Sequence, residues 1–363
     1  MNKRKACIVT FHCVPNYGAA LQTYGLQEVL KAYFDEVDIL DYRPETLLHE
    51  YRTINSYSFA SFVLSLRAFP TTRRKHHRFN VFLKNLNLTD LKYYSNEEID
   101  AAYFDYDYFF LGSDQIWDPD ITRGFDKVYF GAAQSMSKAC KIAYAASLGR
   151  SQYSDSERIE MRNLLTHVNC LSVREENDRS LIKELAQRPV VSVVDPTILA
   201  GADVFKQFVF DIPYNKYVLI YKLRNSNSEA IYKIAESISV EKGLEVIEIT
   251  GGRKGFARKR HKVFYDASPE LFISLFYHAD FVVTDSFHGT AFSLLFHRPF
   301  ITFLHKTRGS RMTSLLQSVN LQNRLSSTCV KASCNDEIDW ESVELRLSIL
   351  RKKSIEYIRQ SIK

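Results

Sequence analysis

The sequence predicts an α/β protein with two doubly wound, Rossmann-like parallel-sheet domains that face each other across a cleft. The 363-residue chain exceeds the usual size of one hydrophobic core. Short apolar strands alternate with helical segments in two runs, and a cluster of Gly, Asp, Pro and Asn at about 200–215 separates them. We expect an N-terminal domain over 1–205 with a helical insert at about 50–100, a C-terminal domain over 206–337, and a helix over 338–363 that packs back across the hinge.

The composition is that of an ordinary globular protein, with 45% hydrophobic and 25% charged residues. A formal charge of +6 does not indicate a nucleic-acid-binding protein, although it suits anionic ligands. The six cysteines form no Cys-x-x-Cys pair and match no zinc pattern, so we expect reduced thiols in a reducing compartment. No apolar stretch approaches the ~20 residues that span a bilayer, and the apolar run near the N-terminus is too short for a signal peptide. We therefore expect a cytoplasmic protein.

The first strand, Ala6–Phe11, leads into a helix that we expect from Gly18 to about Tyr33. Asn16 and Gly18 lie at the mouth of this first βα unit, and Gln22 follows one helical turn later. The pattern is similar to a nucleotide-binding loop but lacks Gly-x-Gly-x-x-Gly. It is therefore explained equally well by a cleft-lining loop and by a tight turn with a capping Asn.

The third strand, Tyr106–Leu111, is followed by a loop that is mostly small and polar: Gly112, Ser113, Asp114, Gln115 and Trp117. Such residues lie at the carboxyl edge of a parallel sheet, where ligands bind. There Asp114 could act as a base or bind sugar hydroxyls, and Trp117 could stack on a sugar ring. The alternative is a structural loop that the Trp anchors. Ser147, directly after the strand Lys141–Ala146, is expected at the same edge.

Arg174 ends the short strand Cys170–Val173. An Arg that emerges from a strand end towards the cleft is suited to clamp an anion. A salt bridge to Glu175 or Asp178 is an equally good interpretation of the sequence.

The stretch from Asp280 to Phe303 reads as strand, loop, helix and strand. Its loop places four residues with polar or small side chains at a helix N-terminus: Ser286, His288, Gly289 and Thr290. Free N–H groups and the positive end of the helix dipole at that position suit a phosphate. A His there can donate a proton to a phosphate or a leaving oxygen. The alternative is a capped turn in which the His packs on a neighbour.

The helical insert is strongly basic between Arg67 and Lys84, a segment without any acidic residue. A basic, aromatic-rich insert suits an anionic membrane surface or a lipid pyrophosphate. The simpler interpretation is a solvated helix face.

Six segments taken in order resemble the polysaccharide pyruvyl transferase family. Each is weak alone, but the six in order and at family-like spacing are specific, and the match runs from about residue 8 to 304. The segments are Asn16-Tyr17-Gly18-Ala19-Ala20-Leu21-Gln22, Gly112-Ser113-Asp114-Gln115-Ile116-Trp117, Tyr144-Ala145-Ala146-Ser147-Leu148-Gly149, Ser172-Val173-Arg174-Glu175, Val194-Asp195-Pro196-Thr197 and Thr284-Asp285-Ser286-Phe287-His288-Gly289-Thr290.

The resemblance implies a two-domain fold similar to GT-B glycosyltransferases, without a metal or cofactor. It implies phosphoenolpyruvate as donor and a sugar hydroxyl pair as acceptor, joined as a cyclic pyruvate ketal. The family's catalytic His falls on His288 and its donor-binding Arg on Arg174. The family pattern places a further Arg two residues before the His, where this chain has Ser286. The expected replacements lie on the loop after the next strand: Lys306, Arg308 and Arg311.

These assignments suggest a mechanism. We expect His288 to act as an acid on the phosphate or on the enol carbon, and Asp114 to deprotonate the sugar hydroxyl from the opposite wall of the cleft. Ser286 and the N–H groups near Gly289 and Thr290 would bind phosphate oxygens. We expect the acceptor to be a sugar of a cell-surface polysaccharide or its lipid-linked precursor, with peripheral contact at the inner membrane surface and no nucleic acid.

Two other functions are compatible with the fold. A GT-B transferase could use a nucleotide sugar, but 299–325 contains no Asp or Glu to bind a ribose. A non-catalytic anion-binding protein could also have this fold, and the combination of His288, Arg174 and Asp114 argues against it.

Overall fold

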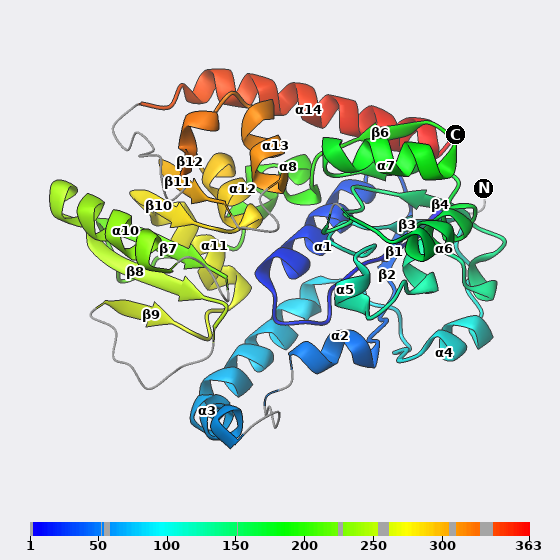
Figure 1. Cartoon of the computed structure of the whole chain (residues 1–363), viewed down its shortest axis with the longest axis horizontal. Coiled ribbons are helices and arrows are strands. Elements are labelled where there is room, and N and C mark those ends of the chain that lie inside the picture. The colour runs from blue at the N-terminus through cyan, green and yellow to red at the C-terminus, as the bar shows by residue number, and fades with distance from the viewer. Residues whose placement is uncertain are drawn as a thin grey trace.

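The protein is described by a computed structural model, shown in Figure 1. The residues that it describes are 3–51, 53, 59–150, 152–223, 228–252, 261–304, 310–326 and 337–363.

The N-terminal domain is built on a parallel sheet in which four strands pair in the order β2-β1-β3-β4. Strands β5 and β6 pair with each other, and single bridges from Ile142 to Cys170 and from Ala146 to Val173 place β5 beside β4. The strands are β1 (Lys5–Val9), β2 (Glu36–Ile39), β3 (Tyr108–Leu111), β4 (Cys140–Ala143), β5 (Leu171–Val173) and β6 (Val190–Ser192). The helices are α1 (Tyr17–Leu30), α2 (Glu45–Glu50), α3 (Phe59–Phe82), α4 (Asn96–Ala101), α5 (Pro119–Thr122), α6 (Asp155–Leu165) and α7 (Glu176–Ala186).

The C-terminal domain holds a second parallel sheet, with the strand order β12-β11-β10-β7-β8-β9. Two short helices, α8 (Pro196–Ala200) and α9 (Ala202–Lys206), precede it. Its strands are β7 (Tyr217–Lys222), β8 (Glu245–Thr250), β9 (Lys262–Phe264), β10 (Phe281–Thr284), β11 (Phe300–Phe303) and β12 (Leu325–Ser326). Its helices are α10 (Ser228–Lys242), α11 (Pro269–His278), α12 (Phe287–Leu295) and α13 (Ser310–Ser318).

The central strands are short, apolar and buried on both faces, as parallel strands covered by helices are. In β10 every residue is buried, and β7 is buried except at Lys222. The strand order reverses between β1 and β3 in the first sheet and between β7 and β10 in the second. Ligands of open α/β sheets bind at the carboxyl ends of the strands beside such reversals. The predicted α/β class with two Rossmann-like domains is therefore confirmed.

The two domains pack closely around the N-terminus of α1. Tyr17 stacks on Phe272 of α11, with 4.6 Å between ring centroids, and its hydroxyl donates to the carbonyl of Ala267 at 2.9 Å. Helix α8 packs against both α1 and α12. These contacts bring the first turn of α1 to the edge of the second sheet.

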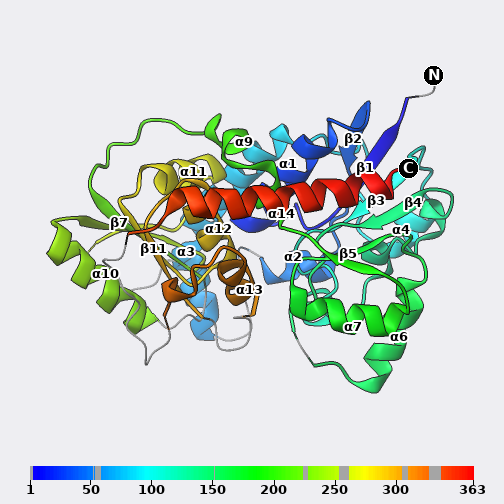
Figure 2. The ribbon, with the colours of Figure 1, turned by 90° about the horizontal axis from the view of Figure 1, so that it is seen from above.

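The C-terminal helix α14 (Trp340–Ser361) runs along both domains, as Figures 1 and 2 show. Trp340 stacks on His297 of the C-terminal domain at 5.0 Å. At the other end, the Tyr357 hydroxyl donates to the carbonyl of Ala143 in β4 at 2.8 Å. Helix α14 therefore ties one domain to the other on the side away from α3.

The expected helical insert is largely the long helix α3. Its second half packs on both domains: Phe79 contacts Tyr17 of α1 at 5.1 Å between ring centroids, and Arg74 Nε donates to Asp266 Oδ2 at 2.7 Å. Within the described residues, no helix combines the length and the apolar character needed to cross a membrane.

Candidate functional site

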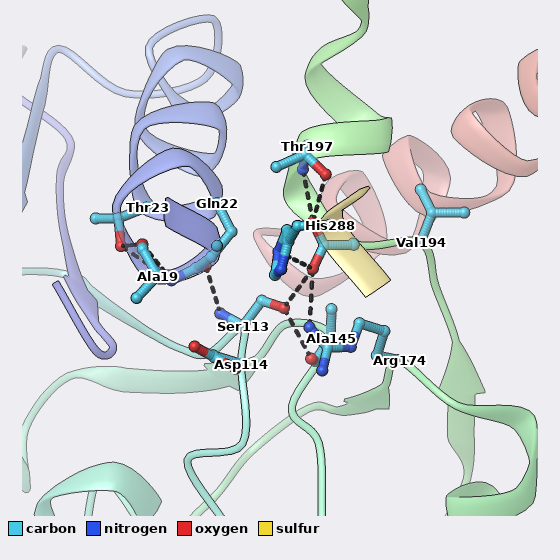
Figure 3. Close-up of polar contacts among 12 residues, drawn as sticks. Ala19, Gln22, Thr23, Ser113, Asp114, Ala145, Arg174, Val194, Thr197 and His288 are labelled. Atoms are coloured by element: carbon cyan, nitrogen blue, oxygen red, sulfur yellow. Dashed lines mark hydrogen bonds and ion pairs between the residues drawn. The ribbon is translucent and has the colours of Figure 1, made fainter. Parts of the chain in front are cut away.

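The candidate site lies where the carboxyl ends of the two sheets meet. His288 is in the first turn of α12, Ser113 and Asp114 follow β3, and Arg174 follows β5. Figure 3 shows these side chains converging beside the first turns of α1 and α8. The structure therefore brings together the three residues predicted to be catalytic, His288, Asp114 and Arg174.

Asp195 is the centre of the cluster. It is the N-cap of α8, and its Oδ1 accepts from the N–H of Thr197 at 2.9 Å and from the Thr197 hydroxyl at 2.7 Å. Its Oδ2 accepts from Arg174 Nη1 at 2.9 Å and from Ser113 Oγ at 3.3 Å, and lies 3.7 Å from His288 Nε2. Burial raises the pKa of Asp195, but His288 and Arg174 together lower it below its usual value. One buried carboxylate thus lies beside both the predicted donor-binding Arg174 and the predicted catalytic His288.

Arg174 is 8% exposed and is held on three sides. Besides Asp195, its Nε donates to Glu175 Oε1 at 2.8 Å, and the guanidinium lies over the ring of Phe287 at 4.7 Å. Burial lowers the pKa of Arg174, but the carboxylates of Glu175 and Asp195 more than offset this effect, so it stays charged. The salt bridge to Glu175 considered from the sequence is present. Nη2 is nevertheless buried without a hydrogen-bond partner.

His288 is also 8% exposed, and its Nε2 is buried without a hydrogen-bond partner. Its ring lies against the backbone of Gly18: a Cβ at that position would be 2.2 Å from His288 Nδ1. Burial lowers the pKa of His288, Asp195 raises it and Arg174 lowers it, so the net direction is downward. The imidazole is therefore neutral at pH 7 in the free protein.

Asp114 supplies a second, partly exposed acid on the N-terminal side of the cluster. Its φ of 75° is left-handed, and its carbonyl accepts from the N–H of Ser147 at 3.0 Å. The carboxylate Oδ1 accepts from the N–H of Gln115 at 2.9 Å. Its charge is one of the smaller effects that raise the pKa values of His288 and Arg174.

The N-terminus of α12 is suited to an anion, but only part of the predicted set can contact one. Ser286 is the N-cap and makes no capping bond with its side chain. Gly289 permits a close approach to the sheet, since a Cβ there would be 2.2 Å from Thr284 Oγ1. The prediction that Thr290 binds phosphate is corrected by its hydrogen bonds. Its N–H donates to the carbonyl of Ser286, and its hydroxyl bonds that carbonyl and Thr302 Oγ1, so it is satisfied within the fold.

Some of the residues predicted to line the acceptor side lie around the site, and others, described in the next paragraph, have side chains bonded or packed inside the N-terminal domain. Asn16 caps α1 through Oδ1, which accepts from the N–H of Gly18 at 2.9 Å, and stays partly exposed. Ser147 is fully buried and its hydroxyl has no hydrogen-bond partner. Gln115 is 7% exposed and donates to Asp118 Oδ2 at 3.1 Å.

Gln22 and Trp117 are corrections. Gln22 is fully buried: its Oε1 accepts from the N–H of Ser113 at 3.2 Å, and its Nε2 bonds Thr10 Oγ1 at 3.0 Å. It positions the loop after β3 and does not contact the cleft. Trp117 is also 0% exposed, and it stacks on Phe130 with 5.1 Å between ring centroids. The prediction that Trp117 stacks on a sugar is wrong for this conformation, and the anchoring alternative holds.

The basic residues proposed to replace the family's second Arg can be placed only in part. Lys306 and Arg308 lie outside the described residues. Arg311 is at the start of α13, and its charge is one of the smaller effects that lower the pKa of His288. Arg311 is therefore on the C-terminal side of the site, and its charge acts on the imidazole.

The carboxyl group of Glu175, which bonds Arg174, interacts with a second carboxyl group, that of Asp178. Asp178 Oδ2 accepts from the N–H of Leu148 at 3.2 Å. Burial and the adjacent carboxylate of Glu175 raise the pKa of Asp178 to about 8. Asp178 is therefore mostly protonated at neutral pH.

We predict that Asp178→Asn makes the stability of the protein less dependent on pH between about 4 and 8. Because the pKa of Asp178 is raised on folding from 3.8 to about 8, the wild type loses stability as the pH rises between these two values. An Asn keeps the bond to Leu148 and carries no proton to lose. Melting temperatures measured at intervals from acidic to alkaline pH should fall less steeply for Asp178→Asn than for wild type. If the curves of melting temperature against pH are parallel for the two proteins, the raised pKa of Asp178 is contradicted.

Within the described residues, no group of three His, Cys, Asp or Glu side chains is arranged as a metal site. The cluster instead offers cations, N–H groups and two acids around buried donors that lack partners. Such an arrangement can bind an anion, hold it beside a neutral imidazole and move protons at its edge.

The fold and this site define a class of two-domain proteins with paired Rossmann-like sheets. Two solved structures show the same fold. A UDP-N-acetylglucosamine 2-epimerase from Rickettsia bellii is 12% identical, with a TM-score of 0.53 over 99% of this chain and 97% of that one. A protein from Listeria monocytogenes assigned as a UDP-N-acetylglucosamine 2-epimerase is 11% identical, with a TM-score of 0.52 over 98% and 90%.

The family is shown by sequence. The model of the polysaccharide pyruvyl transferase family matches residues 16–307, and this chain belongs to that family. A search of curated proteins found no match to this chain. The matched region contains the whole cluster from Asn16 to His288.

The roles of two residues of the site, Asp195 and Gly18, were not predicted from the sequence. Asp195 was part of a family segment without an assigned role, although a carboxylate directly after a strand at the same sheet edge could have suggested one. Gly18 was predicted to line the cleft, but its contact with His288 joins two domains. No local pattern reveals such a contact.

Proposed function

We propose that this protein transfers pyruvate from phosphoenolpyruvate to two hydroxyls of a sugar, as a cyclic ketal. The observation that carries the proposal is the pair of unpartnered buried nitrogens, Arg174 Nη2 and His288 Nε2. Both side chains approach the same oxygen, Asp195 Oδ2, at 2.9 Å and 3.7 Å. Buried polar groups in native proteins have partners, so these two are suited to receive one from a ligand.

The donor's two anionic groups match the cations and N–H groups of the site. A planar guanidinium with one free edge suits the carboxylate. The N-terminus of α12, where Ser286 makes no capping bond, together with Arg311, suits the phosphate. The family membership supports a transferase acting in polysaccharide biosynthesis.

Protons would move as follows. Asp114 accepts the proton of the first sugar hydroxyl as its oxygen bonds to C2 of the donor, while His288 gives a proton to C3, which becomes a methyl group. The C2–O bond to phosphate then breaks. The second hydroxyl bonds to C2 and its proton leaves with the phosphate. Asp114 then releases its proton to solvent and His288 regains one from solvent, so both return to their starting states. The sum is one donor and one diol converted into one ketal and one phosphate.

This role requires His288 to gain a proton when the donor binds. In the free protein burial keeps the imidazole neutral. A dianionic phosphate near Nε2 favours the charged form, because an opposite charge at hydrogen-bond distance raises the pKa of a His. The donor would thus create its own acid.

Thermal unfolding with a panel of ligands tests the proposal. At ~100 times its Kd, phosphoenolpyruvate should stabilise the protein by about 2.7 kcal/mol, seen as a rise in melting temperature. Pyruvate and inorganic phosphate, which each carry half of the donor, should stabilise it less. Arg174→Lys should lose the response, since one ammonium group cannot bond Glu175 and Asp195 as the guanidinium does and also offer a nitrogen to the donor. Stabilisation by UDP-N-acetylglucosamine with no response to phosphoenolpyruvate would reject the proposed donor.

A further inference from the structure

The first half of α3 buries small side chains and exposes large apolar ones, the opposite of what a surface helix usually does. The residues it buries are small, Ser65, Ala68 and Thr71. The large apolar side chains of Phe62 and Leu66 are instead 38% and 50% exposed. A surface helix of a globular protein normally turns its large apolar residues inward. This segment therefore presents an apolar face to the outside.

Basic side chains accompany that face. Phe62, Leu66 and Arg73 are spaced i, i+4 and i+11, so they lie along one side of the helix, and Arg73 is exposed. From residue 51 to 89 the sequence has seven Lys or Arg and no Asp or Glu. The exposed face of α3 is thus apolar at its start and carries the exposed Arg73 about two turns after Leu66, whereas Arg74 and Arg78 pair with Asp266.

We propose that this face of α3 docks the protein on an anionic lipid surface. Phe62 and Leu66 would enter the boundary between headgroups and acyl chains, and Arg73 would pair with lipid phosphates. The combination decides the partner. A nucleic acid would leave the apolar side chains unused, and a second copy of the chain would bring like charges face to face.

The docking helix is fixed to the catalytic cleft. Its second half buries Phe79 and Phe82. Lys75 Nζ lies 5.1 Å from the ring centroid of Tyr17, the residue before Gly18, which contacts His288. Figure 1 shows α3 extending beyond the sheets beside α11 and α2. A protein seated through α3 therefore holds its cleft at a fixed orientation to the lipid surface.

Co-sedimentation of the full chain with vesicles tests the proposal. We expect binding to vesicles of equal parts phosphatidylglycerol and phosphatidylcholine, weakened by high salt, and none to phosphatidylcholine alone. Leu66→Ser should weaken binding about tenfold, because a Leu side chain no longer enters the apolar layer. Arg73→Glu, which changes the charge by two, should weaken it roughly 25-fold.

Matched controls lie on other helices. Val240→Ser on α10 removes an apolar side chain that is 85% exposed, and Lys353→Glu on α14 reverses an exposed charge. Both should bind like wild type. If Leu66→Ser melts early, Phe62→Ser one turn before it repeats the test.

Three results would overturn the proposal. One is no binding to the anionic vesicles, and another is equal binding by wild type, Leu66→Ser and Arg73→Glu. The third is a dimer, seen by light scattering, that Leu66→Ser separates, because the face would then belong to a second copy.

Discussion

Asp195→Ala is expected to cost about 3–5 kcal/mol of folding free energy and to remove activity, the largest combined effect of any single substitution in this site. The carboxylate is fully buried and accepts hydrogen bonds from Thr197, Ser113 and Arg174. Without it, Arg174 is a buried cation with only Glu175 to balance it. Breaking a buried ion pair by removing one partner is strongly destabilising. Thermal or urea unfolding measures the loss, which should lower the melting temperature of a chain of this length by about 5 °C.

Asp195→Asn separates the functional part of this effect from the structural part. An Asn keeps the size of the side chain and an acceptor oxygen, but it removes the charge that faces both His288 and Arg174. We expect a folded protein whose turnover falls by about 10²-fold or more, because both groups lose their positioning partner. Thr197→Val is the control: it removes one bond to the other oxygen, Oδ1, and should cost about 1 kcal/mol with little effect on turnover. Equal turnover of Asp195→Asn and wild type would contradict the central role of this carboxylate.

Gly18→Ala is expected to reduce turnover about 10²-fold while leaving the fold intact. The new methyl group would lie 2.2 Å from His288 Nδ1 and 2.4 Å from Cε1, so the imidazole must move or the domains must separate. Alanine is otherwise favoured over glycine in a helix, by about 1 kcal/mol, so α1 itself gains. Steady-state kinetics with a purified acceptor measures the change.

A double-mutant cycle identifies the cause of the Gly18→Ala effect. The clash with His288 should also lower the melting temperature of Gly18→Ala, but not in a His288→Ala background, where the methyl group no longer meets the imidazole. A loss of the same size in both backgrounds would show that the contact with His288 is not what Gly18 is needed for.

The sequence was sufficient to predict which sheet edge carries the site. Strands such as Tyr108–Leu111 and Phe281–Thr284 are apolar on both faces, and polar residues follow them directly, so the carboxyl-edge rule located Ser113, Asp114 and His288. Arg174 followed from the same rule. These predictions depend on local pattern and on a general property of parallel sheets.

The direction in which a loop side chain points was not predictable from the sequence. Trp117 belongs to the loop after β3 and Gln22 to the second turn of α1, both at the correct edge, yet both are buried in the N-terminal domain. Phe130 and the carbonyl of Tyr129, which hold Trp117, are distant enough in sequence that no periodicity reveals them.

The roles of Asp195 and Gly18 likewise depend on tertiary contacts. Asp195 reaches Arg174 and His288 because α8 packs between α1 and α12. Gly18 matters because the first turn of α1 meets the second domain. Neither contact leaves a mark on the residues next to it in the sequence.

The central claim is that phosphoenolpyruvate binds beside a neutral His288 and converts it to an acid. Calorimetric titration at about pH 8, where the donor phosphate is dianionic, tests this claim when repeated in two buffers with different heats of protonation. We predict that the wild type binds the donor and takes up a proton, and that His288→Gln binds it without proton uptake. The claim is contradicted if the donor does not bind, or if wild type and His288→Gln take up the same number of protons.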